Sequence, residues 1–192
     1  MRALTPIVDQ IQYIQRATGA TATETIYGET ALRWLYTTRV GLFLERHILS
    51  RRWVSQLYGW YLSSRWSRRK ISHFVATLGL DPTESEFPPR KYWCFNDYFV
   101  RKLKPECRIV DRDPRHFVSS ADGRLLVYPV VQDTVFPIKG RKFSVASFLQ
   151  DSALAASYEG GFVIVIRLCP ADYHRFHFPA DGVPTASQAI PG

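Results

Sequence analysis

The sequence predicts an α+β fold in which basic, amphipathic helices come first and a β-rich domain follows. The first observation is a region from Ala31 to Val75 without proline and with only two glycines, Gly41 and Gly59, which favours successive helices. The second observation is that short apolar runs, rich in β-branched residues and bounded by glycine or proline, follow Phe117. Because the two patterns do not alternate, a parallel α/β sheet is not expected.

These patterns divide the chain into three parts. Residues 1–80 form a helical region that we expect to associate with membranes. A connector with one short helix covers 81–116, because Asp81-Pro82 and Pro88-Pro89 interrupt the helical pattern. Residues 117–192 form the β-rich domain.

The helical region carries the excess positive charge of the chain. Between residues 31 and 75 there are nine arginines and lysines and one acid, Glu45, and nine minus one equals the net charge of +8. Tryptophan and tyrosine are interleaved with these charges, as in "RRWVSQLYGWYL". This composition is typical of helices at a membrane surface, where rings lie at headgroup level and basic groups meet phosphates. Two alternatives are a solvated helix face and nucleic-acid binding, but no recognised nucleic-acid motif supports the second.

The remaining composition narrows the class of protein. A hydrophobic content of 46%, with 14% aromatic residues, is ample for a packed core. The three cysteines form no CxxC pair, so we expect a reducing compartment and no cysteine zinc site. The first twenty residues contain no apolar signal-peptide core, and no apolar run approaches the ~18 residues that span a bilayer. We therefore expect a protein that is soluble or lies on a membrane without crossing it.

The connector contains a short predicted helix. The stretch "CFNDYFVRKLKPECR" has Asn96 as a candidate N-cap and Pro105 as a candidate end.

Four stretches of the β-rich part predict its elements. The runs "GRLLVYPVV" and "GFVIVIRLC" predict strands. "IKGRKFSVASFL" predicts a strand entering a helical turn, and "SALAASYEGG" predicts a helix stopped by two glycines.

The stretch "LCPADYHRFHFPADG" brings two histidines into one short segment. Pro179 and the flanking phenylalanines favour an extended backbone, in which an offset of three sends His174 and His177 to opposite faces. The two imidazoles would then have different neighbours and different roles, so no shared metal is expected. Zinc would also need a third ligand, and no spacing identifies one among His116, Asp122 and Asp172.

Asp122 precedes Gly123 in "SSADGRLL", where Asp-Gly is a common turn. An aspartate can also orient a histidine that transfers a proton near neutral pH. Such a pair normally activates a nucleophile. No serine in the C-terminal half has a recognisable nucleophile context, and Ser119, Ser120, Ser144 and Ser147 read as turn and cap residues.

Several stretches together resemble the phosphatidylserine decarboxylases. They run in family order from about Ile26 to Gly192, and the "ADGR" and "RLCPADYHRFHFPADG" segments are highly specific. The matching segments are "YGETALRWLY", "LYGWYLSSRWSRRKISHFV", "FNDYFVRKLKPECRIVD", "VSSADGRLLVYP", "IKGRKFSV", "EGGFVIVIRLCPADYHRFHFPADG" and "IPG".

The resemblance implies a pyruvoyl-dependent lyase that is made as a proenzyme. The family proenzyme cleaves itself at a Gly-Ser bond, and the serine becomes a covalent pyruvoyl group on the small subunit. That carbonyl forms a Schiff base with the substrate amine and accepts electrons as carbon dioxide leaves. Phosphatidylserine thereby becomes phosphatidylethanolamine, and the β-rich domain would be the catalytic domain.

The resemblance also implies roles for three residues. Asp122 and His177 correspond to the aspartate and histidine that activate the serine for self-cleavage. His174 corresponds to the histidine that acts in decarboxylation by reprotonating the carbanion. No metal site and no cofactor-binding residue within the chain are implied.

The chain departs from the family pattern at its end. It stops at Gly192, before any Gly-Ser-Thr motif, so we expect a catalytic domain truncated at its C-terminus and inactive alone. The implied partners are phosphatidylserine, an anionic membrane surface and a C-terminal small subunit, without nucleic acid; self-association is left open. The implied location is peripheral to a membrane, at the cytoplasmic face of the cell membrane if the protein is bacterial. The alternative is an inactive lipid-binding module of the same fold.

Overall fold

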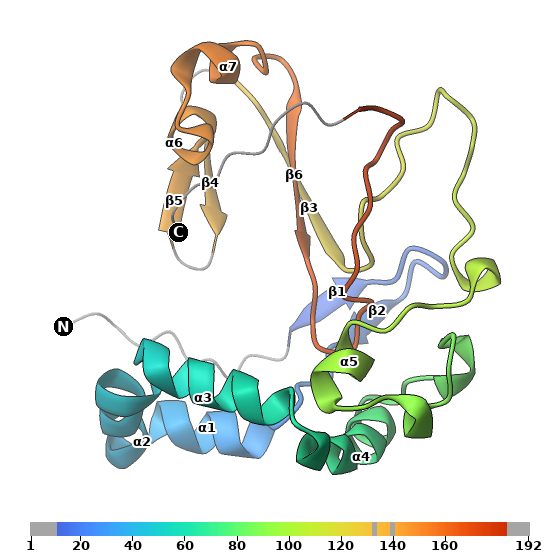
Figure 1. Ribbon diagram of the computed structural model, residues 1–192. Coiled ribbons are helices and arrows are strands. Elements are labelled where there is room, and N and C mark those ends of the chain that lie inside the picture. Colours follow the sequence, from blue (N-terminus) through green and yellow to red (C-terminus); the bar gives the residue numbers. More distant parts are fainter. Residues whose placement is uncertain (1–10, 132–133, 139–140, 184–192) are drawn as a thin grey trace. The chain divides into compact units, whose positions relative to one another are not determined.

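The structure, a computed structural model, describes residues 11–131, 134–138 and 141–183 (Figure 1). The chain divides into two compact units. The first unit ends at Val110 but also contains Tyr173–Arg175, and the second contains Asp111–Asp172 and the residues that follow Arg175. The chain therefore re-enters the first unit for three residues before it returns to the second.

The first unit is mainly helical and includes one small hairpin. Its elements are β1 (Gln12–Ile14), β2 (Thr21–Thr23), α1 (Glu29–Thr37), α2 (Arg39–Leu44), the π-helix η1 (Glu45–Leu49), α3 (Arg52–Leu62), the 3₁₀ turn η2 (Arg65–Arg68), α4 (Arg69–Leu78), the 3₁₀ turns η3 (Pro82–Glu84) and η4 (Pro89–Lys91), α5 (Phe95–Phe99) and the 3₁₀ turn η5 (Pro105–Cys107). The successive helices predicted from the proline-free region are thus confirmed.

Thr38 separates α1 from α2 because its backbone is extended and its side chain caps the second helix. Its Oγ1 accepts the backbone N–H of Gly41 at 3.0 Å and donates to the carbonyl of Trp34 at 2.8 Å. A Cβ atom on Gly41 would lie 2.3 Å from the carbonyl oxygen of Leu35. Glycine at this position therefore allows α2 to fold back closely on α1.

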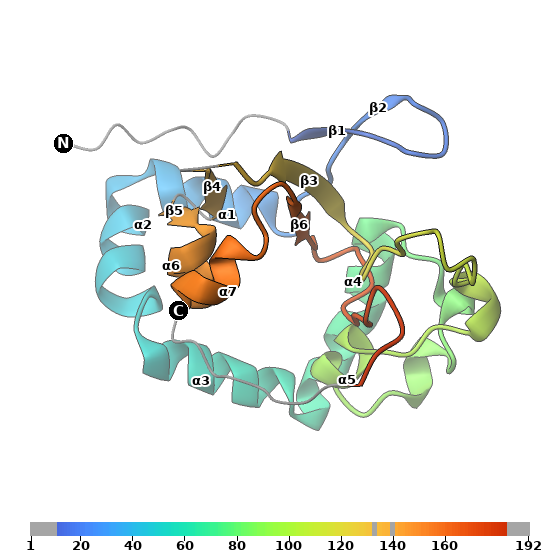
Figure 2. The ribbon, with the colours of Figure 1, turned by 90° about the horizontal axis from the view of Figure 1, so that it is seen from above.

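The core of the first unit is an aromatic cluster between α4 and α5, which lie side by side in Figures 1 and 2. It consists of Ile71 and Phe74 from α4 with Tyr92, Phe95 and Tyr98, all of which are buried. The rings of Phe74 and Phe95 meet edge to face, with centroids 5.0 Å apart. This is a favourable geometry for two aromatic rings, so the cluster fixes the packing of the two helices.

The start and the end of α5 differ from the prediction. Cys94 is the N-cap, and its Sγ accepts the backbone N–H of Asp97 at 3.4 Å. Asn96 lies inside the first turn and instead donates its side-chain amide to Ser63 Oγ at 2.8 Å. The helix also ends well before Pro105, because the following residues leave it to pair with Ser85 in an isolated bridge at Leu103.

The second unit contains the strands and two short helices. Its elements are β3 (Arg124–Pro129), β4 (Val135–Ile138), β5 (Arg141–Ser144), α6 (Val145–Leu149), α7 (Ser152–Ala156) and β6 (Phe162–Arg167). Strand β3 pairs with β6 and β4 pairs with β5, each pair antiparallel. The predicted strands, the strand that enters a helical turn and the helix before the double glycine are all found. Helices together with antiparallel sheets confirm the α+β class.

Side-chain capping connects β5 to α6. The Ser144 hydroxyl accepts the backbone N–H of Ser147 at 3.1 Å, and the Ser147 hydroxyl accepts the backbone N–H of Ser144 at 2.9 Å. This reciprocal pair satisfies two N–H groups that the helix start would leave open. The prediction that both serines are cap residues is confirmed.

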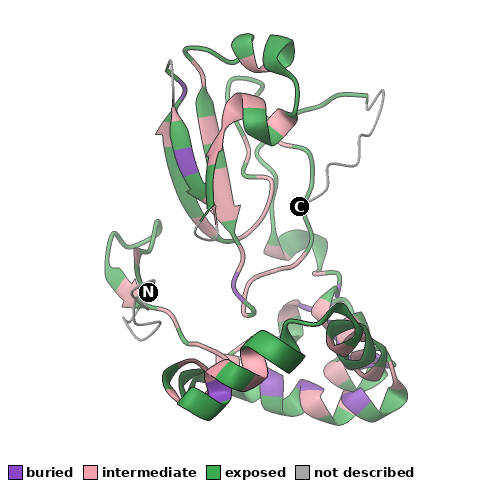
Figure 3. Ribbon diagram, turned by 90° about the vertical axis from the view of Figure 1, so that its left-hand side faces the viewer, coloured by how far each residue is buried: buried purple, intermediate pink, exposed green. Residues whose placement is uncertain are grey.

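The ribbon formed by β3 and β6 is poorly covered within the described residues (Figure 3). Apolar side chains on both strands are exposed, including Leu126 at 55% and Phe162 at 66%. Antiparallel sheets usually pack one face on a core, so this ribbon offers apolar surface for a further packing partner.

No helix in the described ranges combines the length and the apolar character that crossing a membrane requires. The division at residues 80 and 116 stays a prediction.

Candidate functional site

Asp122 lies in the turn that leads into β3, and Gly123 brings this turn against the end of β6. Gly123 has a φ of 152°, and a Cβ atom there would lie 2.7 Å from the carbonyl oxygen of Arg167. The pairing of Arg124 with Arg167 begins immediately afterwards. The Asp-Gly turn therefore places Asp122 beside the carboxyl end of β6.

The segment that follows β6 is held by the carboxylate of Asp172. Its Oδ2 accepts the backbone N–H of Cys169 at 2.7 Å, and its Oδ1 accepts Nη1 of Arg124 at 2.9 Å. The Arg124 and Asp172 side chains are only 21% and 13% exposed, so this ion pair is partly shielded from water. Cys169 is buried, and burial raises the pKa of its thiol.

His177 is placed against the turn that contains Asp122. Its backbone N–H donates to the carbonyl of Ser120 at 2.8 Å, so the histidine segment runs beside the residues just before Asp122. Its Nδ1 lies 2.8 Å from the carbonyl oxygen of Phe178. Because a carbonyl oxygen can only accept, Nδ1 carries the proton of the neutral ring and Nε2 keeps a lone pair. The ring is exposed, so Nε2 is available to take a proton from a nearby group.

His174 belongs to the first unit and contacts a ring of that unit. Its ring centroid lies 4.0 Å from that of Phe99, at the end of α5. The neighbouring Arg175 donates Nε to the carbonyl of Val100 at 2.8 Å, and the Tyr173 hydroxyl accepts the backbone N–H of Leu103 at 3.5 Å. The three residues 173–175 therefore lie along the chain that leaves α5.

The two histidines consequently have different surroundings, as their spacing on an extended backbone predicts. The segment over residues 173–178 is neither helix nor strand. His174 contacts an aromatic ring of the helical unit, whereas His177 pairs with the turn before β3. Their assigned chemical roles, and that of Asp122, stay predictions.

The alternative metal ligands do not assemble into a site within the described ranges. No group of three or more His, Cys, Asp or Glu side chains there could hold a metal ion. His116 instead pairs with Asp111, with 2.7 Å between Nδ1 and Oδ2. That contact helps to lower the pKa of the Asp111 carboxyl, after the larger effect of the backbone N–H of Asp113.

Two further residues support the candidate site. The sequence indicates Asp172 only as a candidate zinc ligand and indicates no role for Arg124. Their ion pair fixes the start of the segment that carries both histidines. The "ADGR" and "PADYH" motifs contain these residues, but nothing in either motif indicates that they contact one another.

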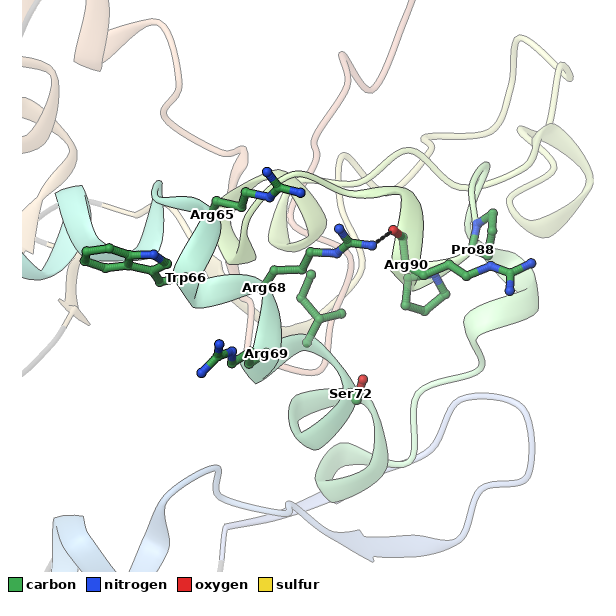
Figure 4. Close-up of a pocket in the computed structure, with 9 residues that line it drawn as sticks. Arg65, Trp66, Arg68, Arg69, Ser72, Pro88 and Arg90 are labelled. Carbon is green, nitrogen blue, oxygen red and sulfur yellow. Dashed lines mark hydrogen bonds between the residues drawn. The ribbon is translucent and has the colours of Figure 1, made fainter.

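The helices of the first unit expose much of their aromatic surface. Trp53 is 57% exposed, Trp60 71% and Trp66 72%, and Phe43 is 60% exposed. Four arginines of the same unit, Arg65, Arg68, Arg69 and Arg90, line a hollow that Figure 4 shows in close-up.

Comparison with known proteins gives a consistent result. The family model for phosphatidylserine decarboxylase matches residues 95–192. The chain is 41% identical to a protein of Fusobacterium nucleatum subsp. nucleatum over 91% of this chain and 58% of that protein. It is 39% identical to a protein of Desulfitobacterium hafniense over 95% of this chain and 61% of that protein. A Clostridium botulinum protein is 37% identical over 90% of this chain and 59% of that protein.

All three relatives are named phosphatidylserine decarboxylase proenzyme. The chain spans between 58% and 61% of their length. The match covers the β-rich part, the segment with both histidines and most of the helical region.

Proposed function

Because this chain belongs to the phosphatidylserine decarboxylase family, we propose that it is part of a proenzyme that converts phosphatidylserine to phosphatidylethanolamine and carbon dioxide. One observation supports specific residues for this function: the backbone N–H of His177 donates to the carbonyl of Ser120. It joins two motifs, "SSADG" and "HRFHFP", that lie far apart in the sequence. A site assembled from these motifs contains an aspartate and a histidine in neighbouring segments.

In this proposal His177 is the base for self-cleavage. The Phe178 carbonyl fixes the proton on Nδ1, which leaves Nε2 free to remove the hydroxyl proton of a serine. The carboxylate of Asp122 stabilises the positive charge that develops on the ring. Self-cleavage would therefore depend on both side chains.

The proposed role of His174 is to handle a proton in the decarboxylation itself. Its contact with Phe99 restricts the ring, while Arg175 holds the adjacent backbone at Val100. A histidine oriented in this way can return a proton to the carbon that loses carbon dioxide.

The prosthetic group that the family uses is a pyruvoyl group made from a serine. When present, it supplies an electrophilic carbonyl that withdraws electrons as carbon dioxide leaves. The residues of this chain fit such a group, because the exposed imidazole of His177 has its acceptor nitrogen unused by other described residues. We propose no serine between residues 11 and 183 as the one that forms the pyruvoyl group.

We also propose that the basic, aromatic helices bring the protein to the cytoplasmic face of a membrane. The exposed tryptophans and the arginines of the first unit support this placement, because both residue types favour the headgroup region. An inactive lipid-binding module of the same fold is the second candidate, and the same exposed surface would serve it.

Expression of the chain together with the coding sequence that follows residue 192 separates the two candidates. We expect a Gly-Ser bond to be cut, seen as two bands on a denaturing gel, and carbon dioxide to be released from labelled phosphatidylserine. A longer product that neither cuts itself nor releases carbon dioxide would favour the inactive module.

Three substitutions in that longer protein test the residue roles. Asp122→Ala and His177→Ala should leave the proenzyme uncut, whereas His174→Ala should be cut but should release little carbon dioxide. His116→Ala is the matched control, because His116 is an exposed histidine of the unit that contains Asp122 and His177 and pairs with Asp111 instead. Normal cutting of both the Asp122 and the His177 variants would overturn the assignment.

A further inference from the structure

The first unit contains a hollow of about 750 Å³ whose walls carry four arginines (Figure 4). One wall is the η2 turn and the start of α4, which provide Arg65, Arg68 and Arg69. The other wall is the loop of Pro88, Pro89 and Arg90. Figure 4 shows Arg65 and Arg68 extending from η2 toward that wall, whereas Arg69 extends in the opposite direction and the Arg90 side chain extends away from Arg68.

One buried serine anchors the turn that forms the first wall. Ser67 is completely buried, and its Oγ lies 2.8 Å from the carbonyl oxygens of both Leu62 and Ser64. Because Ser67 faces the interior of the 3₁₀ turn, its neighbours Trp66 and Arg68 are directed to the surface. Arg65 and Arg68 are therefore held on a turn that the buried hydrogen bonds of Ser67 fix.

The two walls are tied together by an arginine. The guanidinium of Arg68 donates to the backbone carbonyl of Arg90. One N–H of the five on this side chain is used in that bond, so the others remain available to a ligand. Arg65 is positioned by Trp93, whose ring centroid lies 5.3 Å from its guanidinium carbon.

The positive charge of the hollow is not neutralised by the described part of the protein. Within residues 11–131, 134–138 and 141–183, no carboxylate lies within ion-pair distance of Arg65, Arg68, Arg69 or Arg90. Elsewhere arginines do have such partners, as Arg33 has Glu29 at 2.8 Å. Like charges gathered around one hollow repel each other, and an anion bound between them removes that repulsion.

Arginine is the side chain best suited to phosphate, because its planar fork donates two parallel hydrogen bonds to phosphate oxygens. The rim of the hollow carries Trp66, which is 72% exposed, and Trp93, which is 60% exposed, lies against Arg65. Exposed indoles beside arginines favour a phosphate at a bilayer surface over one in free solution.

We propose that this hollow binds the phosphate group of an anionic phospholipid, with Arg65 and Arg68 as the main donors and Arg69 and Arg90 as supporting charges. That the phosphate belongs to a lipid rests on the membrane association proposed above. That the hollow binds phosphate rests on its arginines alone. The residues that line the hollow belong to the first unit, whereas Asp122 and His177 belong to the second.

The test compares two variants of equal net charge. The pocket variant carries Arg65→Gln, Arg69→Gln and Arg90→Gln, and keeps Arg68 so that the two walls stay joined. The control carries Arg39→Gln, Arg46→Gln and Arg52→Gln, three exposed arginines of the same unit outside the hollow. Each loses three positive charges from a net charge of +8.

Binding is measured by co-sedimentation with vesicles of phosphatidylglycerol in phosphatidylcholine. These vesicles contain no phosphatidylserine, so the result does not depend on decarboxylation. We expect the pocket variant to bind at least about tenfold more weakly than the control. Equal loss in the two variants would mean that bulk charge alone attracts the membrane and would overturn the proposal.

Two further arms complete the test. A variant with lysine at positions 65, 69 and 90 keeps the charge but loses the forks, and should bind between the parent and the glutamine variant. Circular dichroism of each variant checks that it is folded like the parent. Inorganic phosphate should displace the protein from vesicles only in the millimolar range. If phosphate bound to the hollow but left vesicle binding unchanged, the lipid would be excluded as the ligand of the hollow.

Discussion

The backbone N–H of Phe95 donates to the side-chain oxygen of Ser67 at 2.9 Å, and both residues are buried. This bond joins the η2 turn to the first turn of α5, so it connects the arginine-lined hollow to the aromatic core. Ser67→Ala would leave the buried N–H of Phe95 without an acceptor. We expect a loss of about 1–3 kcal/mol in the free energy of unfolding.

Urea unfolding followed by tryptophan fluorescence measures this loss, since Trp34, Trp53, Trp60, Trp66 and Trp93 all lie in the first unit. Ser55→Ala, at an exposed position of α3, is the matched control and should change the free energy by less than about 0.5 kcal/mol. Similar values for the two variants would contradict the role assigned to Ser67.

Gly123→Ala should destabilise the second unit. An alanine Cβ would lie 2.7 Å from the backbone carbonyl of Arg167, and the φ of 152° is itself unfavourable for alanine. We expect the free energy of unfolding of this unit to fall by about 1–3 kcal/mol, seen as faster hydrogen exchange of the backbone amides of residues 124–128. Gly59→Ala is the control, because Gly59 lies in a helix of the first unit and its Cβ would meet nothing within 4 Å, so exchange of the same amides should stay unchanged. Unchanged exchange in Gly123→Ala would show that β6 can move away.

Local sequence patterns predicted the helices and strands of this protein better than they predicted which of these elements contact one another. The runs "GRLLVYPVV" and "GFVIVIRLC" contain their own strand signal, because β-branched residues between glycine and proline favour extended backbone. That the two runs pair in the register Arg124 to Arg167 is a long-range fact with no local signature.

The same distinction explains the error at α5. Asn96 is a good capping residue by its chemistry, but Ser63 provides a partner for its amide from a distant part of the chain. The candidate site shows a similar limit. The motifs predicted Asp122, His174 and His177 as functional residues, whereas the bond between His177 and Ser120 depends on the fold.

Cys169 should make the stability of the second unit depend on alkaline pH. Burial raises the pKa of its thiol above the ordinary value of 9.0, so the folded protein keeps a proton that the unfolded chain loses. The contribution of the protonated thiol to the free energy of unfolding is therefore fully present below about pH 9. It is lost as the pH rises through the pKa of the thiol in the folded protein. Cys169→Ala should remove this part of the decrease in urea unfolding followed by circular dichroism.

Cys107→Ala serves as the control for that experiment, because Cys107 lies in the first unit and is only partly buried. It should retain the alkaline decrease of the parent. A Cys169→Ala variant that loses stability as steeply as the parent would show that the thiol is not the titrating group.

The last prediction concerns the ion pair between Arg124 and Asp172, whose side chains are 21% and 13% exposed. Asp172→Ala removes the acceptor of both the Arg124 guanidinium and the backbone N–H of Cys169, in a place that water reaches poorly. We expect the free energy of opening of this region to fall by about 1–3 kcal/mol, measured as faster hydrogen exchange of the β6 amides. Asp181→Ala, at an exposed position of the same segment, should leave exchange unchanged.

In the double variant with Arg124→Ala, the loss should be smaller than the sum of the single losses, because the two side chains share one interaction. Strict additivity would show that Asp172 acts through the Cys169 backbone alone, and the segment that carries both histidines would then be held without Arg124.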